Sequence, residues 1–537
     1  MASDPQPLGR GMIGGVACCL AMIVAAAAPS GRAASVEPVE IARRIDEHVL
    51  GAHVALVDDT AFLRRVTLDL TGRIPTVAEV HDYLAEDSRS RSATAINRLL
   101  HAGVHTRNMA TFFRRTWVPQ ADTREFAGVA DPFEAWLTGR LRDGARYHEL
   151  VTEILTQDPT GAQSGSAGPW GFFEANQGKP ENLAASAARG FLGLNLDCAQ
   201  CHDHPHARWT REQFWQTAAF FADVPPGAGP ARPGLPKIKI PETDRECEPV
   251  FLTAAAVAVP AAPDSRALRQ AFVAWMLEDG ERLMAKNAVN RLWSHFFGEA
   301  VVEPMDDLSR EEFQTGERAA LLDELADLFI ATGYDVHVLV EGMVSSRAYR
   351  LAPTASTPGR DSTPATPTNG PAEATVSVTA DTARFMLTGK PVRGLTGEQL
   401  YDSLRVAAGL PMARSDVGLA DGRSQRDAFT AEFYVERPHG AERSITQALT
   451  LMNGPLVNDL TTAEGNRILA SLLAAPFVAP DDQIDTVFLA VLGRHPTSDE
   501  LDTVRRRFAG SPELGPADRL GSLFWALVNS FEFCTNH

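Results

Sequence analysis

Two cysteines and a histidine form the most chemically specific group in the sequence. Cys198 and Cys201 lie three positions apart and His202 follows directly, in the segment DCAQCHDHPH. Cys-x-x-Cys-His is the attachment signature of a c-type haem, because two thiols at this spacing reach the two vinyl groups of one porphyrin. The adjacent imidazole then supplies the proximal iron ligand. We therefore expect haem c as the cofactor, held covalently by Cys198 and Cys201, with His202 on the iron.

The same segment is open to other metal or redox chemistry. A single metal ion would use His202, with His204 and His206 as alternatives, because Pro205 favours a loop there. Zinc sites usually take a second pair of ligands, but the sequence contains no second Cys-x-x-Cys. A disulfide between the two cysteines would support thiol exchange. The segment predicts one redox or metal centre, with haem c first and a single metal ion as the alternative.

A second polar group interrupts an otherwise apolar predicted helix and continues into the segment behind it. We treat it as a possible structural polar cluster of Asn290, Arg291, His295, Asp306 and Asp307. A buried asparagine must be hydrogen-bonded, and we expect Asn290 to use Asp306 or Asp307. The alternative is a substrate or metal cluster, and a hydrolase or lyase acting on carbohydrate would have its acidic site near these two aspartates.

Asp69 and Arg73 are a further charged pair at helical spacing. They lie four positions apart around Leu70, a separation at which opposite charges on one helix face form an ion pair. We expect a surface or loop-bracing ion pair, with charge placed in a cleft as the alternative.

The elements that position these residues are predicted to be helices. Apolar residues recur every three or four positions in Glu281–Phe297, again around Ile484–Val491, and in Leu520–Phe533, which is the helical period. Alternating, strand-type runs are scarce, with Lys237–Ile240 and Val376–Val378 as short candidates. We predict a mainly α, multi-helical fold with little strand.

The N-terminus carries an export signal. An apolar run from Met12 to Ala28 follows Arg10 and ends in small residues, which is typical of a secretory signal peptide. We assign residues 1–34 to it and expect a periplasmic or extracellular protein, with an uncleaved N-terminal anchor as the alternative. No later stretch reaches the roughly 20 apolar residues of a spanning helix.

Charge and cysteine content exclude several classes. Lys and Arg total 50 against 68 Asp and Glu, a net charge of −18, so we expect no nucleic-acid partner and no binding to an anionic membrane surface. Six cysteines in 537 residues are too few for a disulfide-stapled fold. Two would leave with the leader, and the sequence does not decide whether Cys247 and Cys534 pair.

Proline-rich segments divide the chain. Residues 225–236 read PPGAGPARPGLP, and a second run rich in Pro, Ser and Thr begins at Pro353; neither composition continues a helix. We predict an N-terminal domain over 40–224 that holds Cys-x-x-Cys-His, a connector over 225–263, and a helical domain over 264–533. A disordered linker over 353–378 interrupts the last.

Long motifs in the first half resemble a known family. They are VTLDLTGRIPT (66–76), KPENLAASAARGFLGL (179–194) and LGLNLDCAQCHDHPHARWTREQFWQTAAFF (192–221). They are similar to the planctomycete-specific cytochrome-like domain, an exported bacterial domain of unknown function with a CAQCHDHP core. NAVNRLWSHFFGEAVVEPMDDL (287–308), GLTGEQLYDSL (394–404) and SITQALTLMNGP (444–455) resemble its companion planctomycete-specific domain. The resemblance implies two packed family domains over nearly the whole mature chain.

The resemblance implies a role only in outline. It suggests an exported c-type haem protein with a redox or electron-transfer role, linked by context to polysaccharide breakdown, and a redox partner or an exported hydrolase as its partner. The chain departs from longer members, since it has no separate small cytochrome c domain ahead of Val66 and no second Cys-x-x-Cys-His. A non-haem metal-binding or disulfide-braced scaffold, and a carbohydrate-active enzyme, are the alternatives; whether the protein is an enzyme stays open.

Overall fold

The structure is a computed structural model, and it describes most of the chain. The described residues are 36–51, 54–123, 125–157, 168–222, 235–253, 264–308, 315–353, 387, 389–412, 424–433, 444–475 and 477–537. The predicted signal peptide over 1–34 and, apart from Pro353, the predicted linker over 353–378 lie outside these residues. Within those ranges, no helix combines the length and the apolar character needed to cross a lipid bilayer.

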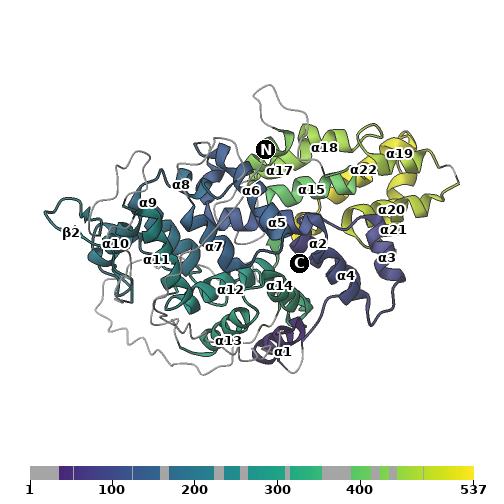
Figure 1. Ribbon diagram of the computed structural model, residues 1–537. Helices are drawn as coiled ribbons and strands as arrows, with labels where there is room; N and C mark the ends of the chain where they lie inside the picture. Colours follow the sequence, from purple (N-terminus) through teal and green to yellow (C-terminus); the bar gives the residue numbers. More distant parts are fainter. Residues whose placement is uncertain are drawn as a thin grey trace, which may run out of the picture. The chain divides into compact units, whose positions relative to one another are not determined.

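The fold is mainly α, as predicted (Figure 1). The helices before residue 223 are α1 (Pro38–Val49), α2 (Asp59–Thr71), α3 (Val77–Ala85), α4 (Arg91–Leu100), α5 (Gly103–Trp117), α6 (Ala127–Arg142), α7 (Tyr147–Thr156), α8 (Gly171–Ala175), α9 (Pro180–Ala187) and α10 (Arg211–Ala218). Short helical turns are η1 (Pro119–Asp122), η3 (Ala188–Leu192), η4 (Asp197–Gln200), η5 (Ala219–Phe221) and η7 (Ala348–Arg350).

The later helices continue the same architecture. They are α11 (Ser265–Leu277), α12 (Glu281–Phe297), α13 (Glu317–Ala331), α14 (Val336–Ser345), α15 (Gly397–Ala407), α16 (Gln425–Glu432), α17 (Ile445–Asn453), α18 (Pro455–Leu460), α19 (Arg467–Leu473), α20 (Pro480–Leu492), α21 (Ser498–Ala509), α22 (Pro516–Val528) and α23 (Phe531–Cys534). Many begin at a capping box that the sequence encodes, as at Thr76, Thr210 and Thr396, where the side chain three residues on completes the reciprocal pair.

Strands in the described part form two short antiparallel pairs. β1 (Ile238–Lys239) pairs with β2 (Glu246–Cys247), which confirms the strand predicted over Lys237–Ile240. β3 (Arg393–Gly394) pairs with β4 (Thr535–Asn536). The second pair joins segments far apart in the sequence.

Two hydrophobic cores hold the helices together. The larger takes most of its side chains from α1 to α14, with Leu489 of α20, and it includes Ile240, Cys247 and Phe251 of the predicted connector over 225–263. The smaller is built by α15 to α23, together with Leu68 of α2 and the adjoining Ile74. Helix α2 therefore contributes to both cores, since its Val66 and Leu70 belong to the larger one.

Asp69, on α2 between these apolar positions, is 1% exposed. Its Oδ1 accepts hydrogen bonds from Arg393 Nη2 and from Asn536 Nδ2, each at 2.7 Å. Its Oδ2 accepts from the Tyr349 hydroxyl at 2.6 Å and from Lys390 Nζ at 3.3 Å. Burial alone would raise the pKa of Asp69, but Lys390 and Arg393 outweigh it and hold the pKa below its usual value. The carboxylate is thus ionised and fully bonded.

The C-terminal segment closes around α2. Arg65 Nε donates to the carbonyl oxygen of His537 at 3.1 Å, and its Nη1 donates to the carbonyls of Tyr349 and Leu351 at 2.6 and 2.9 Å. Figure 1 accordingly marks the C-terminus beside α2.

The predicted ion pair between Asp69 and Arg73 is wrong. Arg73 instead forms a bidentate ion pair with Glu79, in which Nη1 and Nη2 donate to the two carboxylate oxygens at 2.7 and 2.8 Å. Helix α2 ends at Gly72, which takes a left-handed conformation with φ 72°, so Arg73 lies beyond the helix face that carries Asp69. Residues four positions apart are neighbours on a helix surface only if the helix includes both of them.

Candidate functional site

The Cys-x-x-Cys-His segment lies at the surface between η3 and α10, and its first residues form the short turn η4. It leaves η3 through Gly193, whose φ is 65°; a Cβ there would lie 2.9 Å from Leu308 Cδ1. Cys198 lies on η4, and Cys201 and His202 lie in the turn behind it. The side chains of Ala199 and Trp209 are buried, which seats the loop on the larger core.

Two residues of the loop, Gln200 and Asp203, are held by α10. The carbonyl of Gln200 accepts from Trp215 Nε1 at 3.1 Å and from Arg211 Nε at 3.4 Å. Asp203 Oδ1 accepts from the main-chain amide of Arg211 at 2.8 Å. The loop therefore has a defined backbone, even though its reactive side chains face water.

The three predicted haem-binding side chains are accessible. Cys198 and Cys201 are free thiols with exposed side chains, and His202 is exposed as well. His202 Nδ1 lies 2.7 Å from the carbonyl oxygen of Asp203. Because a carbonyl only accepts, Nδ1 carries the proton and Nε2 keeps its lone pair, which is the tautomer that metal-binding histidines commonly use.

His204 and His206, the alternative metal ligands, bond within the loop. His204 Nδ1 accepts from the main-chain amide of His206 at 3.1 Å. In the ranges that the structure describes, no three His, Cys, Asp or Glu side chains are grouped as a metal ion would require. The remaining cysteines, Cys247 and Cys534, are both buried and form no disulfide with each other. Of the predicted groups, the donor set on this loop fits covalent haem attachment, with two free thiols and one imidazole lone pair.

A cavity of about 790 Å³ lies between α5, α12 and the start of α15. We call it the arginine-lined cavity. One helical face of α5 supplies a wall, made of Val104, Arg107, Asn108, Thr111, Phe112, Arg115 and Thr116. The opposite walls come from α12, the segment behind it, and the start and first turns of α15, with Asn536 of β4.

Helix α12 brings two of the predicted residues to this cavity. Arg291 and His295 are one turn apart on the helix and both line the cavity. Arg291 Nε donates to Asn287 Oδ1 at 2.9 Å, and its Nη2 donates to the carbonyl of Arg189 at 3.0 Å. Burial lowers the pKa of Arg291 from its usual value. Both acceptors are neutral, so they do not balance its charge.

His295 is a neutral acceptor at the cavity wall. Its Nε2 lies 3.3 Å from the carbonyl oxygen of Asp69, so Nε2 carries the proton and Nδ1 the lone pair. The ring packs against Phe112, with centroids 4.8 Å apart. Burial, with Arg393 and Lys390 nearby, lowers the pKa of His295 to about 4, so the ring is uncharged at neutral pH.

The other members of the predicted polar cluster separate into two groups. Asp306 lines the cavity and lies 3.9 Å from Arg189 Nε. Asn290 is fully buried and brackets the main chain of Val302, donating from Nδ2 at 2.8 Å and accepting at Oδ1 at 3.0 Å. Asp307 is 2% exposed, and its main-chain amide donates to Pro304. Asn290 thus bonds to the main chain of Val302 rather than to either aspartate.

Sequence reasoning missed most of the cavity wall. The residues not singled out include Arg107, Asn108, Thr111, Arg115, Arg393, Glu398, Asp402 and Arg426. Those on α5 do carry a signal, because polar residues recur there at intervals of three and four within one helix. The residues of β3, α15 and α16 have no such signal, since their position depends on tertiary packing.

Arg189 of η3 links the Cys-x-x-Cys-His loop to the cavity. Arg189 lines the cavity and forms an ion pair with Asp197, the residue directly before Cys198. Its Nε also lies near Asp306. A charge on the loop and a charge in the cavity are therefore bridged by a single guanidinium.

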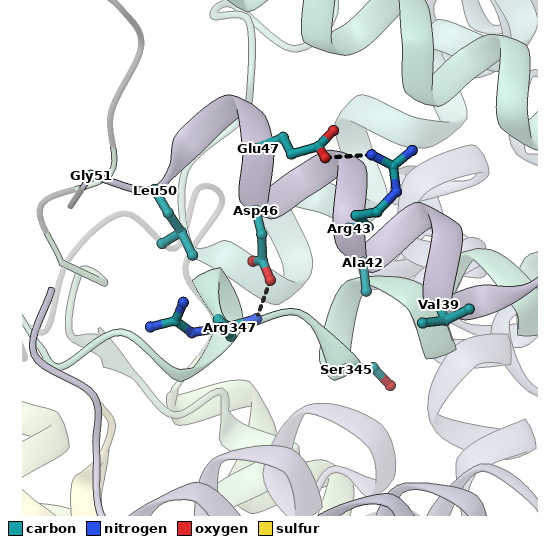
Figure 2. Close-up of a pocket in the computed structure, with 9 residues that line it drawn as sticks. All are labelled: Val39, Ala42, Arg43, Asp46, Glu47, Leu50, Gly51, Ser345 and Arg347. Atoms are coloured by element: carbon teal, nitrogen blue, oxygen red, sulfur yellow. Dashed lines mark hydrogen bonds and ion pairs between the residues drawn. The ribbon is translucent and has the colours of Figure 1, made fainter. Parts of the chain in front are cut away.

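A second hollow, of about 590 Å³, lies between α1 and the end of α14 (Figure 2). Asp46 there accepts from the main-chain amides of Arg347 and Ala348 at 3.0 and 2.9 Å, and Glu47 pairs with Arg43. The carboxylates of Asp46 and Glu47 are thus used by the backbone and by Arg43, which indicates a structural role.

Comparison with known proteins finds two families of unknown function along the chain. Residues 41–225 match the family described as "Protein of unknown function (DUF1549)", and residues 268–508 match "Protein of unknown function (DUF1553)". The two matches stand in the order of the two predicted domains. No curated protein and no solved structure matches the chain. The arginine-lined cavity takes Arg107 and Arg189 from the first matched region and Arg291 and Arg393 from the second, so it lies between them.

Proposed function

We propose that the protein is an exported c-type haem protein with a redox or electron-transfer role. Cys198 and Cys201 would form the thioether bonds, and His202 would be the proximal ligand. The observation that carries the proposal is the hydrogen bond between His202 Nδ1 and the carbonyl of Asp203 at 2.7 Å. It leaves Nε2 as the ligand atom, beside two free and exposed thiols.

The surrounding loop supports this assignment. Gln200 and Asp203, on either side of Cys201 and His202, are bonded to α10. A fixed backbone keeps the orientation of a metal-binding imidazole and its tautomer. The buried Trp209 seats the loop on the core, so the donor atoms are presented to a porphyrin without unfolding the region.

The cofactor would supply one-electron exchange when bound. The chain would hold it at an exposed loop, and exposure favours electron exchange with another protein. A redox partner or an exported hydrolase is the partner we propose. The association with polysaccharide breakdown rests on the family resemblance and adds no residue to the site.

The test is expression with export in a host whose haem-attachment system is active. We expect a haem c absorption band in the reduced protein and an intact mass increased by one haem. Cys198→Ser with Cys201→Ser should abolish both signals. His202→Ala should keep the mass but change the spectrum, and His206→Ala, an exposed histidine on the same loop, should change neither.

Two results would overturn the proposal. A folded, exported sample without covalent haem would exclude it, provided a known c-type cytochrome matures in the same cells. Stoichiometric zinc or another metal by elemental analysis, lost in His202→Ala and in the double Ser variant, would establish the single-metal alternative instead.

A further inference from the structure

The arginine-lined cavity has a charge pattern unlike the rest of the chain. The protein has 50 Lys and Arg against 68 Asp and Glu. The cavity wall instead holds six arginines, Arg107, Arg115, Arg189, Arg291, Arg393 and Arg426, against five carboxylates, Asp122, Glu303, Asp306, Glu398 and Asp402. Arginine offers five donors in a planar fork that fits carboxylate and phosphate groups.

Four of these arginines are already matched by carboxylates. The pairs are Arg115 with Glu398, Arg189 with Asp197, Arg393 with Asp69, and Arg426 with Asp402. Such pairs fix the orientation of the guanidinium groups. They build the wall but leave little charge for a ligand.

Arg291 differs from them. Within the described residues it has no carboxylate partner, and its two hydrogen bonds go to an amide oxygen and a main-chain carbonyl. Two neighbouring charges act on it in opposite directions, since the carboxylate of Asp306 raises the pKa of Arg291 and the guanidinium of Arg189 lowers it. A partly buried cation whose hydrogen bonds all go to neutral groups is stabilised by an added anion.

His295, one turn along α12 from Arg291, offers the cavity a hydrogen-bond acceptor. Its Nδ1 is a lone-pair acceptor and has no hydrogen-bond partner within the described ranges, while its Nε2 is used by Asp69. An acceptor of this kind receives a hydrogen bond from a hydroxyl group. Further hydroxyl and amide side chains line the same space, from Asn108, Thr111, Ser294, Thr396 and Gln399.

From this pattern we infer that the arginine-lined cavity binds a small polyhydroxylated organic anion. Arg291 binds its carboxylate or phosphate group, and His295 Nδ1 accepts a hydrogen bond from one of its hydroxyls. Phe112 supplies an apolar surface for the carbon skeleton. The volume, about 790 Å³, lies within the range of small-molecule sites. The site contains neither the two cysteines nor His202, although Arg189 joins its wall to their loop through Asp197.

Titration calorimetry with three related probes tests the inference. D-gluconate carries a carboxylate, D-glucose 6-phosphate carries a phosphate, and D-glucose carries neither. We expect at least one charged probe to bind about tenfold or more tightly than glucose, since hydrogen bonds to charged groups are the stronger class. Comparison of gluconate with glucose 6-phosphate identifies which anion the site prefers.

Variants on one helix locate the site. Arg291→Met should weaken the preferred charged probe roughly 10- to 100-fold, while Arg291→Lys should retain part of the affinity. His295→Phe keeps a similar ring but removes the acceptor, and should weaken binding several-fold. Arg282→Gln is the matched control, because Arg282 lies on the same helix in an exposed pair with Asp327; its affinity should equal that of the wild type.

The inference fails if neither charged probe binds more tightly than glucose. It also fails if folded Arg291→Met, verified by circular dichroism, binds the charged probe as the wild type does. Should Arg291→Met not fold, Arg291→Lys and His295→Phe decide, and unchanged affinity in both would overturn it. The titration is repeated with Cys198→Ser/Cys201→Ser, which cannot attach haem covalently. Unchanged affinity in this variant shows that the anion binds whether or not the haem proposal holds.

Discussion

The carboxylate of Asp69 accepts a hydrogen bond from the side-chain amide of Asn536 at 2.7 Å, across 467 positions of sequence. The same oxygen accepts from Arg393, also at 2.7 Å. Asp69 belongs to α2 in the first matched region, whereas Arg393 and Asn536 form the β3–β4 pair. The buried carboxylate of Asp69 thus adds a charged interaction to the apolar packing between the two matched regions.

Replacing Asp69 by asparagine should be strongly destabilising. The change leaves the buried cations Lys390 and Arg393 without their carboxylate, and breaking a buried pair in this way costs about 3–5 kcal/mol. Urea denaturation of the two proteins gives the difference. Asp327→Asn, in an exposed pair with Arg282, should cost less than about 1 kcal/mol. Equal losses in the two variants would contradict the role given to Asp69.

Stability should fall as the pH drops from about 6.5 to 4. His105 and His295 have pKa values of about 4, mainly because burial disfavours their charged forms, against about 6.5 in an unfolded chain. Between these values the unfolded state binds more protons, so the free energy of unfolding decreases with falling pH. Each histidine contributes up to about 3 kcal/mol of this loss.

Denaturation curves at pH 7.5, 6, 5 and 4.5 measure this effect. His295 faces Asp69, Arg393 and Lys390, and His105 faces His337, His295 and His101. Asp69 has a lowered pKa, so its stabilisation is present above about pH 4 and is lost only below it. A free energy of unfolding that stays constant from pH 7.5 to 5 would show that neither histidine is held neutral.

Gly193 should be needed for the Cys-x-x-Cys-His loop. Alanine there adds a Cβ 2.9 Å from Leu308 Cδ1 and 3.0 Å from Asn287 Oδ1, at a φ of 65°. Backbone strain of this kind costs of order 1–3 kcal/mol, and the clash adds to it. Gly144→Ala is the control, because its φ is 79° but nothing lies within 4 Å. Thermal unfolding should show the larger loss in Gly193→Ala; equal losses would mean that the clash has no effect.

Thiol labelling should divide the cysteines into two classes. In protein made without haem attachment, iodoacetamide should modify Cys198 and Cys201 rapidly, because both are free and exposed. Cys247 and Cys534 are buried and should react only after denaturation. Peptide mass spectrometry after timed quenching reads each site. Rapid labelling of Cys534 in the folded protein would contradict its place in the smaller core.

The sequence predicts the local features of this molecule well. Helical periodicity identifies α12, α20 and α22, although α22 ends at Val528, before the Phe533 predicted for it. The spacing of Cys198 to His202 also identifies the loop without tertiary information. These are properties of neighbouring residues, which is why a single sequence suffices for them.

Long-range features are a different case. The pairing of Asp69 with Arg73 is the natural local choice, yet Gly72 ends the helix and Asp69 bonds to residues more than 300 positions away. Arg291 and His295 can be recognised as polar residues on an apolar helix. That they share a cavity with α5 and α15 depends on packing, which periodicity does not contain.

The bonds of Asp69 also have a consequence in time. A chain that emerges from a ribosome or an export channel in sequence order presents Asp69 and the Cys-x-x-Cys-His loop well before Lys390, Arg393 and Asn536. During that interval the Asp69 carboxylate of α2 lacks the cations that pair with it. Leu68 of α2 and the adjoining Ile74 also lack the side chains of the smaller core, against which they pack in the complete fold. Covalent attachment to Cys198 and Cys201 can therefore begin before β4 pairs with β3, on a loop whose thiols stay exposed in the finished fold.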